Sequence, residues 1–184
     1  MCRARHRAGH DAAGGYVKAL VVSYSNSGTT SLVAAQIARQ LGADVEAILE
    51  TKPRPALLVD GKKSEAGGGA IVKAVFASIF GLGSAIVDSA NDPSRHDLVV
   101  VGTPVWAGGM TPAVRSYLKR HRKSLPRVAF FCSAGDPSKL RAFNQMQRVA
   151  GKAPVATLAL KSDDARSDAC RKTVADFVSQ LGQG

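Results

Sequence analysis

The stretch from Ala19 to Ala38 constrains the fold of this chain more than any other part of the sequence. It begins with an apolar run, ALVV, whose valines favour a strand, and a turn rich in hydroxyl side chains follows. Beyond the turn, apolar residues recur at helical spacing, at Leu32, Ala35, Ala38 and Leu41. The pattern predicts a buried strand, a short loop and a helix.

The loop itself, residues 25–30, has the composition of a phosphate site. Gly28 lets the backbone turn closely, and hydroxyls that can donate to phosphate oxygens come from Ser25, Ser27, Thr29 and Thr30. Unpaired N–H groups and the helix dipole hold a phosphate at a helix N-terminus. Because the loop lacks Lys, Arg and spaced glycines, a monophosphate fits it better than a triphosphate or pyrophosphate. The alternative is a Ser/Thr cap in a surface turn.

This loop resembles the FMN phosphate loop of the flavodoxin family. In that family the first and third positions of the loop carry hydroxyl side chains, with any residue between them. Gly stands at the fourth position, either Asn or Thr at the fifth, and Thr at the sixth. The corresponding residues here are Ser25, Asn26, Ser27, Gly28, Thr29 and Thr30. The resemblance covers essentially Lys18 to Gly182. It implies FMN as the cofactor, with these six residues around its phosphate.

Four further strands are expected, at residues 44–49, 97–102, 126–132 and 155–160. The first of these alternates polar and apolar residues, which suits a strand near the sheet edge. Helices are expected from near Ala113, over residues 138–149, and at the C-terminal end, with Cys170, Val174, Phe177, Val178 and Leu181 on one side. This alternation predicts a doubly wound five-stranded parallel α/β sheet with helices on both faces. The flavodoxin resemblance implies the strand order 2-1-3-4-5.

A second loop, residues 102–112, contains the only tryptophan, Trp106. An indole offers a large flat apolar surface on which a flavin ring could stack, although a tryptophan in the core is the alternative. The run GTPVWAG resembles the second flavin loop of flavodoxin-like proteins. The ring-binding residues that this implies are Thr103, Pro104, Val105, Trp106, Ala107 and Gly108.

A third loop follows Cys132, and the resemblance places Ser133, Ala134, Gly135 and Asp136 beside the ring. Electron carriers of the family usually have a second stacking aromatic here, whereas this chain has none until Phe143. An open ring face could admit a hydride donor or a quinone. The function therefore remains open between an electron carrier and an NAD(P)H-dependent FMN or quinone reductase, whose relatives act as homodimers.

The chain of 184 residues carries a formal net charge of +11. A basic cluster without acids comprises Arg115, Lys119, Arg120, Arg122, Lys123 and Arg127. It is either a solvated helix face or a docking surface for an acidic redox partner or for the phosphates of NADPH. A binding module without flavin that docks an acidic partner is a further alternative. No motif indicates specific nucleic-acid binding.

The sequence indicates a single domain preceded by a tail. Residues 1–15 lack an apolar core segment and are expected to be a disordered basic tail, and residues 16–184 a single domain. The apolar stretch 70–87 contains Lys73 and glycines, so we expect a helix and a turn rather than a stable membrane span. An interfacial helix is the alternative. Three irregularly spaced cysteines favour a reducing, cytoplasmic location.

No side chain is expected to act as a catalytic acid, base or metal ligand. Neither a Ser/His/Asp set nor a metal-ligand cluster stands out, and a bound flavin carries its own chemistry. Cys132 is expected to pack in the core. His96 and Asp97 precede a strand at its amino end, opposite the predicted site.

Overall fold

The computed structural model describes residues 17–52, 58–59, 62–63 and 83–182. Two predicted features lie wholly or mainly outside these residues. They are the basic tail of residues 1–15 and the helix expected within residues 70–87, of which the structure describes only residues 83–87. Those last residues are not helical.

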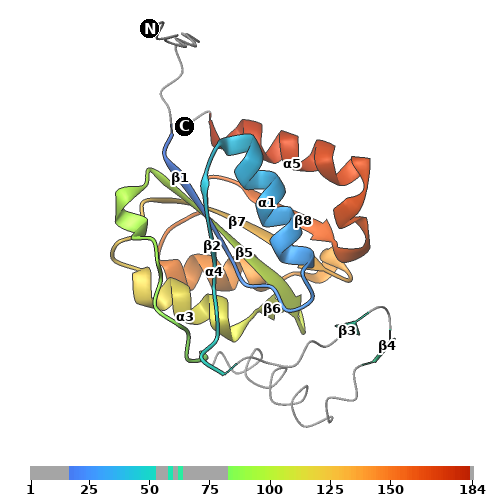
Figure 1. The fold of residues 1–184 in the computed structure, drawn as a ribbon, viewed down its shortest axis with the longest axis horizontal. Coiled ribbons are helices and arrows are strands. Elements are labelled where there is room, and N and C mark those ends of the chain that lie inside the picture. Colours follow the sequence, from blue (N-terminus) through green and yellow to red (C-terminus); the bar gives the residue numbers. More distant parts are fainter. Residues whose placement is uncertain (1–16, 53–57, 60–61, 64–82, 183–184) are drawn as a thin grey trace, which may run out of the picture.

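Five parallel strands form the centre of the molecule (Figure 1). They are β1 (Ala19–Ser23), β2 (Asp44–Ala47), β5 (Leu98–Trp106), β7 (Arg127–Ala134) and β8 (Thr157–Lys161). Their order in the sheet is β2-β1-β5-β7-β8, which confirms the predicted order 2-1-3-4-5. The strand β2 lies at an edge, as its alternating pattern indicated. A separate antiparallel pair joins β3 (Leu58–Val59) to β4 (Lys62–Lys63).

Helices cover both faces of the sheet (Figure 1). One face carries α1 (Thr29–Leu41) and α5 (Asp168–Leu181), and the other carries α3 (Pro112–His121) and α4 (Ala142–Ala150). Alternate strand residues enter the two core layers, so that Val21 packs under α1 while Val22 packs under α3. Both faces of each central strand are therefore buried, which explains the continuous apolar runs.

Two strands run further than the sequence predicts. β5 extends beyond Gly102 to Trp106, and its end pairs in antiparallel fashion with β6 (Gly109–Met110). The turn between them has positive φ at both central residues, 49° at Ala107 and 76° at Gly108, as in a tight two-residue hairpin. Most of the residues expected in the second loop therefore belong to the end of β5, to β6 and to the turn that joins them. Ala107 gives no sequence signal for a left-handed backbone, and so the hairpin was missed.

The third strand-to-helix connection also differs from expectation. β7 includes Ser133 and Ala134, and a short 3-10 turn, η2 (Pro137–Lys139), follows. The Asp136 carboxylate accepts a hydrogen bond of 2.8 Å from the Ser138 N–H and caps this turn. The helix predicted over residues 138–149 therefore begins later, at Ala142.

The last helix matches its predicted pattern, with Cys170, Val174, Phe177 and Leu181 buried. Among the described helices, none combines the length and the apolar character that a membrane crossing requires.

Candidate functional site

The carboxyl ends of four parallel strands meet around one hollow of about 160 Å³. Nine predicted site residues line it: Asn26, Ser27, Thr29, Pro104, Val105, Trp106, Ser133, Ala134 and Gly135. They come from the loop after β1 and from the ends of β5 and β7, and Ser162, directly after β8, completes the described lining. The three predicted loops thus converge on one place, as the winding of the sheet requires.

The first loop presents the N-terminus of α1 to this hollow. Gly28 occupies the N-cap position with φ 89°, and no side-chain hydrogen bond caps the helix within the described chain. The first turn, all of it described, carries no acidic residue. The Gly28 N–H donates to Ser25 Oγ at 3.1 Å, which orders the loop. The N–H groups of the first helical turn and the positive end of its dipole are therefore uncapped beside the hollow.

A buried hydrogen bond ties the first loop to the third. Thr30 Oγ1 and Ser133 Oγ lie 2.7 Å apart, and Thr30 is almost fully buried. Only one of the two hydroxyls donates in this bond, so the hydrogen of the other stays available for a different acceptor. Ser133 lines the hollow, whereas Thr30 is not among its lining residues.

Trp106 lines the hollow, and residues that do not line it, Tyr24 and Arg141, fix its position. Its ring meets the Tyr24 ring edge-on, with centroids 6.0 Å apart and planes at 86°. Arg141 fixes the tip of the hairpin that carries it: the Arg141 N–H donates to the Gly108 carbonyl at 2.7 Å, and the guanidinium donates to the Ala107 carbonyl at 2.9 Å. The indole is therefore positioned before any ligand arrives.

Several predicted residues lie outside the central hollow. Thr103 is buried, and its hydroxyl accepts from the Thr111 N–H at 3.1 Å and donates to the Pro104 carbonyl at 2.9 Å. Ala107 and Gly108 face a neighbouring hollow of about 520 Å³ beside Arg141. Asp136 is exposed, and its hydrogen bonds from Ser138 hold its pKa below the usual range.

Three residues of the site were not predicted from the sequence: Ser162, Tyr24 and Arg141. Ser162 follows the last parallel strand, so the rule that ligands bind at the carboxyl ends of strands could have indicated it. Tyr24 follows β1 directly, and its place after an apolar run gives no sequence signal that separates it from a core residue. Arg141 reaches Ala107 across 34 residues of sequence, for which no local signal exists.

Other reactive side chains lie away from the hollow. Cys132 is buried, and burial raises the pKa of its thiol to about 12, so that it stays protonated at neutral pH. His96 is buried at the amino end of β5, where its ring contacts the Asp92 carbonyl at 3.0 Å and Asp44 Oδ2 at 3.2 Å. These contacts join β2 to the segment before β5.

The basic cluster is partly used within the chain. Arg120 pairs with Asp88 at 2.8 Å, and Arg115 reaches Gln145 at 3.4 Å while burial and the nearby Arg148 lower its pKa. The Arg122 side chain packs beside Gly151. The surface available to a partner is therefore smaller than the run of six basic residues suggests.

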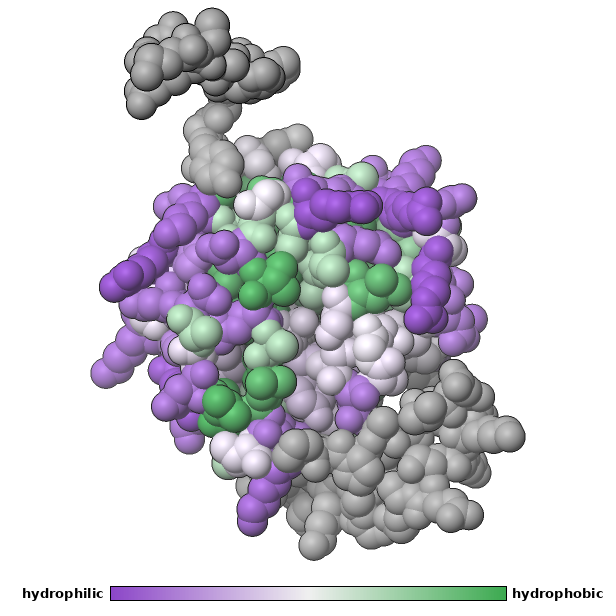
Figure 2. Space-filling model, viewed as in Figure 1, coloured by the Kyte–Doolittle hydropathy of each residue, from purple (hydrophilic) through white to green (hydrophobic). Residues whose placement is uncertain are grey.

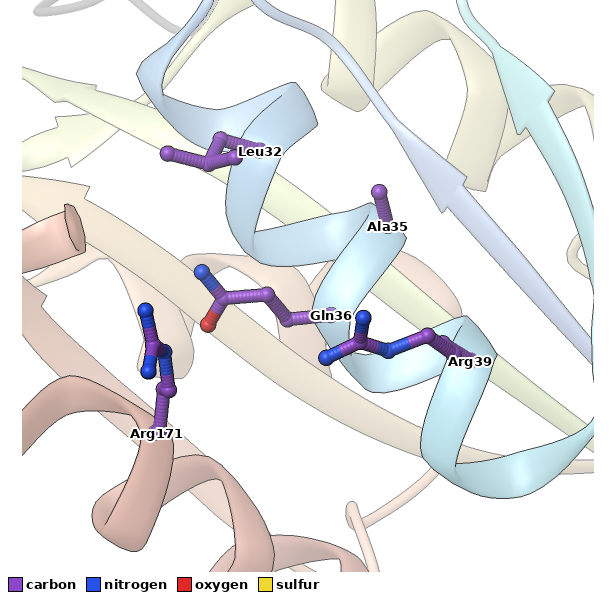
Figure 3. A pocket seen from close by; sticks show the side chains of 5 residues that line it. All are labelled: Leu32, Ala35, Gln36, Arg39 and Arg171. Carbon is purple, nitrogen blue, oxygen red and sulfur yellow. The ribbon is translucent and has the colours of Figure 1, made fainter. Parts of the chain in front are cut away.

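A wider groove of about 570 Å³ lies between α1 and α5 and is lined by Leu32, Ala35, Gln36, Arg39 and Arg171. Figure 3 shows Gln36 and the two arginine side chains reaching toward the gap between these helices. Arg171 pairs with Asp168 at 2.8 Å, and Gln36 donates to the Ala165 carbonyl at 3.2 Å. The groove is polar and basic, but none of the three predicted loops contributes to it.

No family model matches this chain, and no curated protein matches it. Solved structures do. A flavoprotein from Lactobacillus acidophilus in complex with FMN superposes with a TM-score of 0.63 at 21% identity, covering 83% of this chain and 97% of that one. A protein from Bacteroides eggerthii that is assigned as a flavoprotein gives 0.67 at 17%, covering 91% and 99%.

The two-electron-reduced flavodoxin of Megasphaera elsdenii gives a TM-score of 0.50 at 14% identity, covering 88% of this chain and 98% of that one. These matches span nearly the whole length of each known structure. Together with the strand order, they show that this chain has the flavodoxin-like fold.

Proposed function

We propose that this protein binds FMN and acts as a flavodoxin-like redox protein. The observation that carries the proposal is the uncapped N-terminus of α1, which opens on the same hollow as the indole of Trp106. A flat ring that carries a phosphate needs both features, because the helix N-terminus binds the phosphate and the indole stacks on the ring. The FMN complex of the Lactobacillus acidophilus protein, which shares the fold, supports the choice of cofactor.

The residues present fit the phosphate of FMN. Ser27 and Thr29 supply hydroxyl donors beside the N–H groups of α1, and every described residue that lines the hollow is uncharged. A phosphate dianion therefore meets donors and the helix dipole without a repelling carboxylate. Gly28 carries no side chain, and a Cβ placed there would meet nothing within 4 Å. A phosphate can therefore approach the backbone at Gly28.

The residues also fit a ring on one side. Trp106 offers the flat surface, while small residues also line the hollow: Ser133 and Ala134 at the end of β7, and Gly135 directly after it. FMN, when bound, supplies one- or two-electron transfer. The chain's own part is to hold the phosphate, orient the ring through Trp106 and set its exposure.

An NAD(P)H-dependent FMN or quinone reductase is the second candidate. It is favoured by the lining of the hollow, in which Trp106 is the only aromatic among the described residues. A ring covered on one side leaves the other side for a hydride donor or a quinone. Steady-state oxidation of NADPH with a quinone acceptor tests this candidate. A total lack of turnover with pyridine nucleotides would leave the electron carrier, which exchanges electrons with a redox partner protein.

We also propose that the protein works in a reducing compartment, the cytoplasm. Its two described cysteines, Cys132 and Cys170, are buried free thiols. Such thiols are typical of proteins that are kept reduced.

Paired titrations of the flavin-free protein with FMN and riboflavin test the FMN proposal. The two ligands share the ring and differ in the phosphate, so wild-type protein should bind FMN more tightly. Ser27→Asp places a carboxylate in the loop and should weaken FMN binding by about tenfold or more, because the new negative charge repels the phosphate dianion. Its riboflavin affinity should stay close to that of the wild type.

Ser167→Asp is the matched control. It introduces the same charge at the N-terminus of another helix, α5, where Ser167 already caps by accepting from the Cys170 N–H. This variant should bind FMN as the wild type does. A protein that stays colourless with FMN, or that binds riboflavin and FMN equally, would favour the flavin-free binding module instead.

A further inference from the structure

The part of the chain that contains α3 and α4 is strongly basic. Between residues 98 and 162 the sequence has eleven Lys and Arg residues and a single carboxylate, Asp136. That carboxylate caps η2 by accepting from the Ser138 N–H. One negative charge therefore balances eleven positive ones within this stretch, and a surface of one sign attracts partners of the other sign.

Three arginines of this stretch gather beside the hairpin that carries Trp106. Arg141, at the N-cap of α4, is followed by Gln145 and Arg148 at i+4 and i+7, so the three lie on one face of the helix. Figure 1 shows α3 and α4 on the same side of the sheet. Arg115 of α3 reaches this face, because its guanidinium donates to Gln145 Oε1 at 3.4 Å.

Hydrogen bonds fix this face relative to the hairpin. Arg141 donates to the carbonyls of Ala107 and Gly108 at the tip, and Gln145 Oε1 accepts from the Met110 N–H at 3.0 Å. Arg141 also lines the hollow of about 520 Å³ that includes Ala107 and Gly108. A molecule that contacts Arg141 therefore lies against the hairpin that bounds the candidate flavin site.

The charges of these arginines are not neutralised within the described part of the chain. There, no carboxylate forms an ion pair with Arg115, Arg141 or Arg148. Arg115 Nε is buried and has no hydrogen-bond partner among the described residues. Burial and the nearby Arg148 lower the pKa of Arg115, so two cations lie close together. A carboxylate held beside them would offset their repulsion.

The exposed hydrophobic surface lies elsewhere. Figure 2 shows hydrophobic surface gathered along the edge of the sheet formed by β2, where Val45 and Leu49 are 54% and 57% exposed. On the face of α4, by contrast, Arg141 and Arg148 are exposed. Binding to that face is therefore electrostatic, and it should be faster and tighter at low salt.

We propose that Arg115, Arg141 and Arg148 form a docking surface for an acidic redox partner protein, whose carboxylates contact the arginines beside the flavin site. This proposal rests on the proposed function, because the partner is one that exchanges electrons with FMN. Arg141 and Arg148 are separated by about 10 Å along α4, at 1.5 Å per residue, which is more than one carboxylate spans. Several carboxylates on a protein surface match this span, and guanidinium groups bind carboxylates in a bidentate manner.

A titration of the flavin-free protein with a rhodamine-labelled octaglutamate peptide tests the surface without the cofactor. Fluorescence anisotropy at low ionic strength should show binding that weakens as salt is added. Arg148→Glu reverses one charge of the surface and should weaken peptide binding by about tenfold or more.

Arg171→Glu is the matched control. It makes the same charge reversal on α5, at a side chain that is 65% exposed, and it lowers the net charge by the same amount. The α5 helix covers the other face of the sheet, so peptide binding should stay within about twofold of the wild type. Thermal unfolding of both variants shows that they are folded.

Oxidation kinetics of the FMN-loaded protein place the surface relative to the flavin. The protein is first reduced, and it is then oxidised by ferricyanide, an anion, or by tris(phenanthroline)cobalt(III), a cation. Each reduced flavin passes one electron to each of two metal complexes and releases its protons to solvent. Arg148→Glu should slow the ferricyanide reaction by about threefold at low ionic strength and accelerate the cobalt reaction. Arg171→Glu should change both rates less.

Several results would overturn the proposal. Wild-type protein that does not bind the peptide would do so, as would equal weakening by Arg148→Glu and Arg171→Glu, which would indicate an effect of net charge alone. Oxidation rates that do not respond to Arg148→Glu, or that change in the same direction for both metal complexes, would also contradict it.

Two further outcomes would overturn the proposal by identifying a different ligand. Tighter, Arg148-dependent binding of a short DNA duplex would indicate a nucleic-acid surface, and displacement of the peptide by NADPH would indicate a nucleotide site. Because the peptide titration uses flavin-free protein, it can fail while the FMN titrations succeed, and the FMN titrations can fail while it succeeds.

Discussion

Gly28 is the residue on which the backbone of the candidate phosphate loop depends. Its φ of 89° is a conformation that side-chain-bearing residues rarely adopt, although a Cβ would meet no atom within 4 Å. We expect Gly28→Ala to lower the free energy of unfolding by about 1 kcal/mol through backbone strain alone. Urea denaturation measures this. Gly135→Ala, where a Cβ also has open space, is the control and should change stability little.

At Gly102, in contrast, there is no space for a side chain. A Cβ at this position would lie 2.0 Å from Cζ of Phe131, and both residues are buried in adjacent strands. Gly102→Ala should therefore cost about 3 kcal/mol of stability by overpacking.

A double-mutant cycle identifies the cause. Phe131→Leu removes the clashing ring atoms, so Gly102→Ala should cost clearly less in that background. Equal costs in the two backgrounds would contradict the steric explanation.

At the scale of elements, Thr103 joins the end of β5 to the start of α3. Its buried hydroxyl receives the Thr111 N–H at the N-cap of α3. We expect Thr103→Val to destabilise the protein by about 2 kcal/mol, because it leaves the buried Thr111 N–H without its hydrogen-bond acceptor. Thr103→Ser keeps the hydroxyl and should destabilise the protein less. Chemical denaturation of both variants tests this. If instead Thr103→Val left stability unchanged and weakened only FMN, the residue would have the ligand role that the resemblance implies.

The elements also show what periodicity can and cannot predict. The strands and α1 follow directly from apolar runs and helical spacing, because burial on one or both faces imposes those patterns. The hairpin at Ala107 and the late start of α4 depend on a positive φ and on an Asp136 cap, which local composition signals poorly.

At the scale of the whole molecule, the resemblance to the flavodoxin family implied the sheet order that the structure has. That order places the ends of three strands side by side, so the three loops converge. The sequence did not predict the contacts that shape the site. The Tyr24–Glu50 hydrogen bond, the Thr30–Ser133 bond and the Arg141 clamp each join residues that lie far apart in sequence. Such pairs are determined by tertiary packing alone.

At the same scale, we expect His121 to make the stability of the protein depend on pH. Burial lowers its pKa, with a further contribution from Arg120, while Glu46 and Asp92 act in the opposite direction. Below about pH 6.5, the unfolded chain therefore takes up this proton more readily than the folded protein does, and stability falls as the pH falls. His121→Gln should flatten this part of the curve of unfolding free energy against pH. An unchanged slope would show that His121 is not responsible.

The most direct test of the central claim is a comparison of backbone amide chemical shifts on adding FMN and on adding riboflavin to the flavin-free protein. The phosphate is proposed to lie at the N-terminus of α1, so FMN should shift the N–H signals of residues 27–31 strongly and riboflavin should not. Both ligands should shift the Trp106 indole. If the FMN-specific shifts appeared instead beside Arg39 and Arg171 in the groove between α1 and α5, or nowhere, the proposed flavin site would be contradicted.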